Sequence, residues 1–230
     1  MNENNEQQEN VQNEIDKNSR AYKFAAGKGV MNLPNKLTIS RVVMIPVFIL
    51  FFYLNFTGHY FVALAVFAIA SLTDLLDGKI ARKYGLVTNL GKFLDPIADK
   101  VLVLSALVVF LTKPEIFVTA AGMGEWTWIV AGCGVAVILA REIIVSGFRM
   151  VAASAGIVIA ADIFGKYKTT FQDVAVVLLL ITAGVFELGT FDFGDEVINY
   201  VGLAALAIAV ILTVVSGINY IVKNIEVLKK

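Results

Sequence analysis

The sequence has few charged residues, one cysteine and one histidine. Only 17% of its 230 residues are charged, against about 25% in a typical soluble domain. The single cysteine, Cys133, excludes a disulfide within the chain. Nineteen basic residues balance nineteen acidic ones, so the net charge identifies no partner. These shortages argue against both a disulfide framework and an ordinary soluble domain.

Apolar residues are correspondingly abundant. Hydrophobic residues make up 58% of the chain, and the mean hydropathy is +0.76. A membrane-spanning helix needs about 20 mostly apolar residues, and the sequence supplies several such runs. We therefore predict an all-α integral membrane protein with six transmembrane helices and a short N-terminal interfacial segment that begins near Met31. The predicted spans are 37–55, 60–82, 92–112, 126–150, 170–188 and 197–222.

The remaining segments are short, apart from the N-terminus. Residues 1–30 are rich in Asn, Gln and Glu, so we expect a disordered polar tail that is not a signal peptide. No repeat or Pro- or Ser-rich linker divides residues 31–230, which we take as one membrane domain. We expect His59 to be solvated or interfacial in its short connection. Between spans four and five we expect a loop that contains Gly156, Gly165, Lys166 and Lys168.

Basic residues are distributed unequally between the two ends of the spans. The connection between spans one and two has none, and that between spans five and six carries only acids. Cytoplasmic loops are enriched in Lys and Arg, so both termini are predicted to be cytoplasmic, in the plasma membrane if the cell is bacterial. The side predicted to be cytoplasmic receives Lys28, Lys36, Arg82, Lys83, Lys92, Lys166, Lys168, Lys223, Lys229 and Lys230.

Four aspartates lie within 26 residues of this apolar sequence: Asp74, Asp77, Asp95 and Asp99. Residues three or four apart share a helix face, so each pair projects from one face of its span. At 1.5 Å per residue, each aspartate lies about 5–13 Å from the predicted cytoplasmic end of its helix. If the chain reverses between the pairs, the four carboxylates converge on one pocket near the cytoplasmic surface.

Carboxylates at membrane depth need compensation, because each costs about 2.5–3.5 kcal/mol on insertion scales. Two divalent cations would compensate four of them, and such a pair can clamp the attacking and leaving oxygens of a phosphoryl group. Gly78 and Gly91 leave room for a ligand near the carboxylates. A structural ion-pair network and a cation or proton transporter are the alternatives, although transporter sites generally lie at the midplane.

The aspartate segment resembles the CDP-alcohol phosphotransferase family. It matches the family pattern D-x2-D-G-x2-A-R-x8-G-x3-D-x3-D at every fixed position: Asp74, Asp77, Gly78, Ala81, Arg82, Gly91, Asp95 and Asp99. The six-span layout over about residues 31–225 is also similar to the family. Flanking segments such as Asn32–Asn35 and Leu94–Lys100 look most like the branch that makes phosphatidylglycerophosphate.

The resemblance implies a reaction and a set of residue roles. CDP-diacylglycerol would donate its phosphatidyl group to glycerol 3-phosphate and release CMP. Asp74, Asp77, Asp95 and Asp99 would bind two Mg²⁺ or Mn²⁺ ions, and Asp99 would also be the general base. The CDP site would include Asp74, Gly78, Ala81 and Arg82. Inositol phosphate, serine or phosphatidylglycerol as the acceptor remains an alternative.

A phosphorylated acceptor implies a basic subsite. The candidates are Arg141, Arg149, Lys166 and Lys168, each of which has a structural alternative. Arg141 can pair with a helix acid, and the other three can anchor the chain at the membrane surface. Asn35, Thr38 and Arg41 are candidates for either a nucleotide contact or an interfacial role. The expected partners are the two substrates and the bilayer, with no nucleic acid, and the resemblance implies a homodimer.

Overall fold

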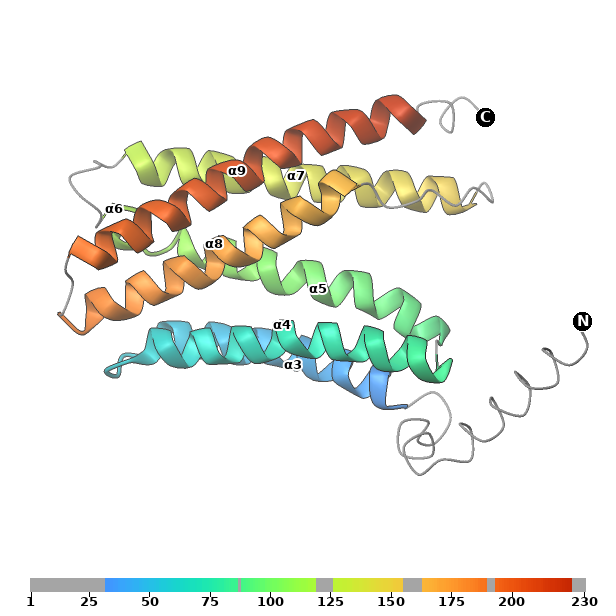
Figure 1. Ribbon diagram of the computed structural model, residues 1–230, viewed down its shortest axis with the longest axis horizontal. Coiled ribbons are helices and arrows are strands. Elements are labelled where there is room, and N and C mark those ends of the chain that lie inside the picture. The colour runs from blue at the N-terminus through green and yellow to red at the C-terminus, as the bar shows by residue number, and fades with distance from the viewer. Residues whose placement is uncertain (1–31, 87, 119–125, 155–162, 190–192, 225–230) are drawn as a thin grey trace, which may run out of the picture. The chain divides into compact units, whose positions relative to one another are not determined.

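The computed structural model describes residues 32–86, 88–118, 126–154, 163–189 and 193–224 (Figure 1). The predicted polar tail, residues 1–30, lies outside this part of the chain. The described residues form helices and no strands. The helices are α3 (Leu33–Tyr53), α4 (His59–Tyr84), α5 (Asn89–Phe110), α6 (Glu115–Val118), α7 (Trp126–Ser154), α8 (Ile163–Glu187) and α9 (Phe193–Asn224).

Most of these helices are long and apolar enough to cross a membrane. Five meet both criteria, namely α3, α4, α7, α8 and α9, and α5 contains a shorter apolar stretch at Lys100–Phe110. Many large apolar side chains are exposed, including Val43, Leu50 and Ile143, as a lipid-facing surface requires. The predicted all-α membrane protein is therefore confirmed, and the predicted interfacial segment is continuous with the first span because α3 begins at Leu33.

Two compact units divide the chain. The first comprises residues 1–50 and 65–102, and the second comprises residues 51–64 and 103–230. The first unit thus holds most of α3, most of α4 and the larger, N-terminal part of α5. The second unit holds α6 to α9 together with the ends of α3 and α5 and the start of α4.

Local capping explains where α3 and α5 begin in the first unit. The Asn32 side chain accepts a hydrogen bond from the Asn35 backbone N–H at 3.0 Å, which makes Asn32 the N-cap of α3. Pro34 falls in the first turn, where its missing N–H costs nothing. The Thr88 hydroxyl accepts a bond from the Gly91 N–H at 3.0 Å and caps α5 in the same way.

A glycine ends α4. Gly85 has a φ of 63°, a left-handed conformation that glycine adopts without steric penalty. The next N–H, from Leu86, donates to the Ala81 carbonyl at 2.9 Å, which completes a Schellman motif. This turn lets the chain reverse between the two halves of the aspartate pattern.

The second unit is built by close helix packing. Here α8 runs along α9, and α7 also packs against α9 (Figure 1). Small residues permit this approach: a Cβ on Gly134 of α7 would lie 2.9 Å from the Val210 side chain of α9. Small residues at such interfaces are typical of membrane helix pairs.

The start of α8 corrects the predicted loop between spans four and five. Gly165, Lys166 and Lys168 lie inside α8, which begins at Ile163, whereas Gly156 lies outside the described residues. One glycine costs a helix only about 1 kcal/mol. The Lys168 side chain, in the second turn of α8, is buried by its contact with Glu142 of α7. The glycine and the lysines therefore did not mark a break in the helix.

His59 is also placed differently from the prediction. It is the first residue of α4 and is only 7% exposed. Its Nδ1 lies 3.2 Å from the Phe51 carbonyl oxygen, and its Nε2 lies 3.8 Å from Glu187 Oε2. His59 is buried rather than solvated because these groups, from the end of α3 and the end of α8, enclose the ring.

Candidate active site

The first two aspartates of the pattern lie near the end of α4 and share a cationic partner. Arg41 of α3 places Nη1 at 2.6 Å from Asp74 Oδ1 and Nη2 at 2.6 Å from Asp77 Oδ2. The Arg41 side chain is fully buried, that of Asp77 is 4% exposed, and that of Asp74 is 37% exposed. One guanidinium therefore bridges both carboxylates, which project from one face of α4.

A hydroxyl from α3 adds to this contact. Thr38 Oγ1 lies 3.2 Å from Asp77 Oδ2, the same oxygen that Arg41 contacts. The spacing of Thr38 and Arg41 puts both on one face of α3, and both side chains are buried. In this structure Arg41 contacts both Asp74 and Asp77, and Thr38 contacts Asp77.

The turn between α4 and α5 is tied to the start of α3. The Asn32 amide donates to the Leu86 carbonyl at 2.8 Å. The Asn35 amide donates to the Thr88 hydroxyl at 2.8 Å, and that hydroxyl lies 3.0 Å from the Asn35 amide oxygen. These bonds fix the connection that joins the two halves of the aspartate pattern.

The second pair of aspartates lies in the first turns of α5. The structure describes the helical backbone at Asp95 and Asp99, and their side chains lie outside the described part of the chain. Among the described side chains, no three His, Cys, Asp or Glu residues could hold one metal ion. That observation does not bear on the predicted four-aspartate centre, because two of its members are not among those side chains.

The predicted CDP-binding residues lie on α4 after the aspartates. Arg82 is exposed and donates from Nε to the Gly78 carbonyl at 3.0 Å. A Cβ on Gly78 would lie 3.6 Å from Arg82 Nη2, which is ordinary contact. Ala81 is partly exposed on the next turn. The Arg82 guanidinium therefore lies over the backbone of Gly78 and near the carboxylates of the preceding turn.

The described donors suit a hard divalent cation. Mg²⁺ and Mn²⁺ prefer carboxylate oxygens, and Asp74 and Asp77 supply such oxygens from one helix face. Together with Arg41, these two side chains carry a net charge of −1. The partly exposed Asp74 gives access from solvent. The local charge and chemistry thus fit a bound cation.

Two of the four acceptor-site candidates lie in a buried polar cluster of the second unit. Lys168 of α8 and Arg141 of α7 both contact Glu142 Oε1, the arginine at 2.8 Å. Arg141 also reaches Ser216 of α9 at 3.0 Å. This cluster, defined by Arg141, Glu142, Lys168 and Ser216, links three helices and contains two cations and one anion. The helix-acid pairing considered for Arg141 is present.

Arg149 differs from these two because its side chain is exposed near the end of α7. Its guanidinium carbon lies 5.4 Å from the centre of the Tyr220 ring, and its Nε lies 3.3 Å from the Tyr220 hydroxyl. This contact orients the guanidinium and leaves it accessible to an anion. The fourth candidate, Lys166, is in the first turn of α8, and its side chain lies outside the described residues.

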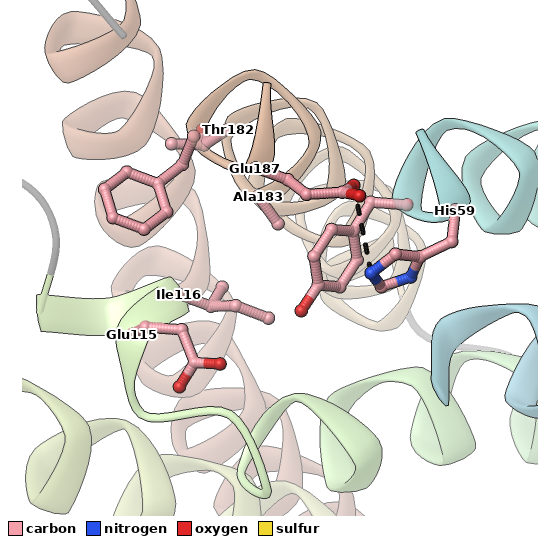
Figure 2. A pocket seen from close by; sticks show the side chains of 8 residues that line it. His59, Glu115, Ile116, Thr182, Ala183 and Glu187 are labelled. Carbon is pink, nitrogen blue, oxygen red and sulfur yellow. Dashed lines mark ion pairs between the residues drawn. The ribbon is translucent and has the colours of Figure 1, made fainter. Parts of the chain in front are cut away.

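A separate cavity of about 210 Å³ lies in the second unit (Figure 2). His59, Glu115 and Glu187 contribute its charged groups. Glu187 accepts a hydrogen bond from the Gly58 N–H at 3.1 Å, and the dashed line in Figure 2 marks its ion pair with His59. The cavity contains none of the predicted site residues. Its charged groups join the connection before α4 to the end of α8.

Comparison with known proteins identifies the family. The family model described as CDP-alcohol phosphatidyltransferase matches residues 31–215. This match covers well over half of the chain and includes α3, α4, α5, α7 and α8. The chain belongs to the CDP-alcohol phosphatidyltransferase family.

The matches to similar curated proteins cover nearly the whole length of those proteins. The chain is 41% identical over 212 residues to a CDP-diacylglycerol–glycerol-3-phosphate 3-phosphatidyltransferase of Bacillus subtilis (strain 168), covering 87% of this chain and 98% of that protein. Proteins of the same name from Rickettsia typhi and Shigella flexneri serotype 5b are each 38% identical. The Rickettsia match covers 82% of this chain and 94% of its relative, and the Shigella match covers 83% and 93%.

The sequence interpretation missed the principal partner of the first aspartates. It identified the pattern residues but left Arg41 and Thr38 between two other roles. The sequence did contain a sign of this contact. Asn35, Thr38 and Arg41 follow one another at intervals of three residues, which puts their polar side chains on one face of an otherwise apolar helix. The sequence likewise predicted only that a helix acid could pair with Arg141. It did not predict that this acid, Glu142, also contacts Lys168, because Lys168 lies on a different helix.

Proposed function

We propose that the protein transfers the phosphatidyl group of CDP-diacylglycerol to the 1-hydroxyl of glycerol 3-phosphate, which gives phosphatidylglycerophosphate and CMP. The observation that carries the proposal is the 41% identity to the Bacillus subtilis enzyme over 98% of its length. The complete aspartate pattern on α4 and α5 supports the same reaction. The protein would thus act in phospholipid biosynthesis.

The four aspartates of the pattern are the proposed metal ligands. Asp74, Asp77, Asp95 and Asp99 would hold two Mg²⁺ or Mn²⁺ ions, which when bound would neutralise the diphosphate and the departing CMP. Asp74, Gly78, Ala81 and Arg82 would bind the cytidine diphosphate. The Arg82 side chain reaches back along α4, and guanidinium groups bind phosphate well because of their planar donor geometry.

Asp99 is the proposed general base. It would accept the proton of the acceptor's 1-hydroxyl while that oxygen forms a bond to the phosphatidyl phosphorus. The bond from this phosphorus to the bridging oxygen breaks, and CMP leaves with that oxygen. The position of Asp99 one turn after Asp95 places the base next to a metal ligand.

The acceptor phosphate requires positive charge on the protein. Arg149 supports this role best, because its guanidinium is exposed and oriented by Tyr220. Arg141 and Lys168 share Glu142, so we propose that they contribute the surplus positive charge of their cluster. Lys166, in the first turn of α8, is the remaining candidate for this subsite.

The proposed location is the plasma membrane, with both termini and the active site on the cytoplasmic side. Lys and Arg placement supports this orientation. Glycerol 3-phosphate and metal would enter from water, and the diacyl chains of the donor would enter from the bilayer. We also propose a homodimer, for which the small residues of α7 permit close helix packing.

The direct test is CMP release from CDP-diacylglycerol by the purified protein with each acceptor in turn. We expect release with glycerol 3-phosphate and divalent metal, and little with serine, inositol phosphate or phosphatidylglycerol. Release with one of the other acceptors alone would replace the proposed acceptor while keeping the reaction. No release with any acceptor would overturn the enzymatic proposal and favour a transporter.

A further inference from the structure

Arg41 is buried, so its role differs from that of an exposed arginine that anchors a helix at the membrane surface. Its side chain is fully buried on an apolar helix, and a buried charge is costly unless it is paired. Both of its ion pairs are with aspartates of the pattern, at 2.6 Å each. Arg41 is therefore positioned to act on those two carboxylates.

The contacts from α3 select particular oxygens. Arg41 approaches Oδ1 of Asp74 and Oδ2 of Asp77, and Thr38 approaches that same Oδ2. The Thr38 hydroxyl divides its single proton between the Pro34 carbonyl at 3.1 Å and Asp77 Oδ2 at 3.2 Å, so Arg41, at 2.6 Å, is the main donor that sets the plane of the Asp77 carboxylate. A carboxylate has two oxygens, so holding one of them sets the direction in which the other points.

The arrangement has a buried side and an accessible side. Arg41 approaches from the interior, whereas the Asp74 side chain is 37% exposed. Of the two carboxylates, Asp74 is thus the one that a cation arriving from solvent can reach directly, since the Asp77 side chain is only 4% exposed. Arg41 compensates one of the two negative charges, which reduces the repulsion between Asp74 and Asp77 before a metal is bound.

We propose that Arg41 is a positioning residue for the metal centre, which holds Asp74 and Asp77 in the orientation that a divalent cation requires. This inference rests on the proposed function, because it assumes that these aspartates bind metal. Residues that hydrogen-bond to metal ligands commonly change metal affinity by about 10–100-fold when they are mutated. Thr38 assists Arg41 through its contact with Asp77.

A competing role would give the opposite result. If Arg41 occupied the place of the metal, removing it would strengthen metal binding, because a positive charge would be lost from the site. If Arg41 positions the carboxylates, removing it weakens metal binding, because Asp74 and Asp77 are then free to move apart. Metal affinity therefore distinguishes these two roles by its direction of change.

The experiment measures Mn²⁺ binding to the full-length protein in detergent after chelation, by the electron paramagnetic resonance signal of free Mn²⁺. We expect Arg41→Gln and Arg41→Lys to weaken binding by about 10–100-fold, and Thr38→Val by a few-fold. Lysine keeps the charge but cannot bridge two carboxylates as the guanidinium does. Ser40→Ala is the matched control on α3, since the Ser40 hydroxyl donates to the Leu37 carbonyl of its own helix, and this variant should bind Mn²⁺ like the wild type.

Activity at increasing Mn²⁺ gives a second readout. A positioning role predicts that Arg41→Lys needs more Mn²⁺ for half-maximal activity and recovers most of its kcat at saturation. A purely structural role would lower kcat at every Mn²⁺ concentration and leave the half-saturating concentration unchanged, which would overturn the proposal. If Arg41→Gln does not fold, Arg41→Lys and Thr38→Val carry the test.

The outcomes separate this inference from the proposed function. A wild-type protein that binds no Mn²⁺ would contradict the metal centre itself. A wild type that binds Mn²⁺, together with Arg41 variants that bind it equally well or more tightly, would overturn the positioning role alone.

Discussion

At the level of single residues, the proposed mechanism assigns different tasks to chemically identical side chains. Asp74 and Asp77 are held by a guanidinium from α3, whereas Asp99 lies a turn beyond Asp95 on α5. A general base needs a proton-accepting oxygen near the nucleophile. The last aspartate of the pattern, the proposed base and also a proposed metal ligand, is therefore the residue whose substitution tests the chemical step.

We expect Asp99→Asn to lower kcat by about 10²–10⁴-fold, the usual contribution of a general base, with binding of CDP-diacylglycerol largely retained. The amide has a similar size but cannot accept the proton. Turnover and donor binding should be measured on the same preparation. Glu115→Gln, in the separate cavity of the second unit, is the control and should leave turnover unchanged. Full activity in Asp99→Asn would remove Asp99 as the base.

Arg149 allows a similar test of the acceptor subsite. Loss of a charged hydrogen bond costs about 1.5–3 kcal/mol, so Arg149→Ala should raise the KM for glycerol 3-phosphate by about tenfold or more. The KM for CDP-diacylglycerol should change much less. Lys223→Ala, an exposed cation near the end of α9, is the matched control. Equal changes in both KM values would count against the assignment of Arg149.

At the level of helices, the apolar runs were sufficient to predict the long elements. Their predicted positions agree with the helices to within a few residues at most ends. The start of α8 is the main exception, because Gly165 and the nearby lysines suggested a loop. Lys168 is buried by its contact with Glu142 on another helix, and such tertiary pairing cannot be inferred from the local composition around residue 168.

Contacts between different helices also limited how much of the site could be predicted from the sequence. Spacing along one helix predicted that Asp74 and Asp77 share a face. No local pattern showed that Arg41, more than 30 residues earlier, bridges them, because that contact depends on how α3 packs against α4. The pattern residues were thus found from the sequence, whereas their supporting residues required the structure.

The polar cluster that links α7, α8 and α9 gives a prediction about stability. Removing one member of a buried ion pair typically costs about 3–5 kcal/mol. Glu142→Gln removes the carboxylate that both Arg141 and Lys168 contact, so we expect a clearly lower Tm in detergent. Glu196→Gln, at the partly exposed start of α9, should leave the Tm nearly unchanged.

A double variant checks the reason for that loss. Glu142→Gln combined with Lys168→Met should be less destabilising than Glu142→Gln alone, because the double variant no longer buries this lysine charge without its carboxylate. A double variant that is less stable than the single one would show that the cluster stabilises the helices by a means other than charge pairing.

At the level of the whole molecule, orientation in the membrane decides which substrates can reach the site. The positive-inside distribution predicts that the connection before α4 lies outside the cell and that the end of α9 lies inside. In a Cys133→Ser background, Thr57→Cys should react with an impermeant thiol reagent in intact cells. Lys223→Cys should react only after the membrane is opened. The reverse pattern would invert the proposed orientation.

The family match and the aspartate pattern lead to one reaction: phosphatidyl transfer to glycerol 3-phosphate. The purified protein should be supplied with CDP-diacylglycerol, Mg²⁺ and radiolabelled glycerol 3-phosphate, and both products should be quantified. We predict one labelled lipid formed for each CMP released, with both products lost when the metal is chelated and restored when Mg²⁺ is added back. CMP release without labelled lipid, or no release at all, would contradict the proposed function.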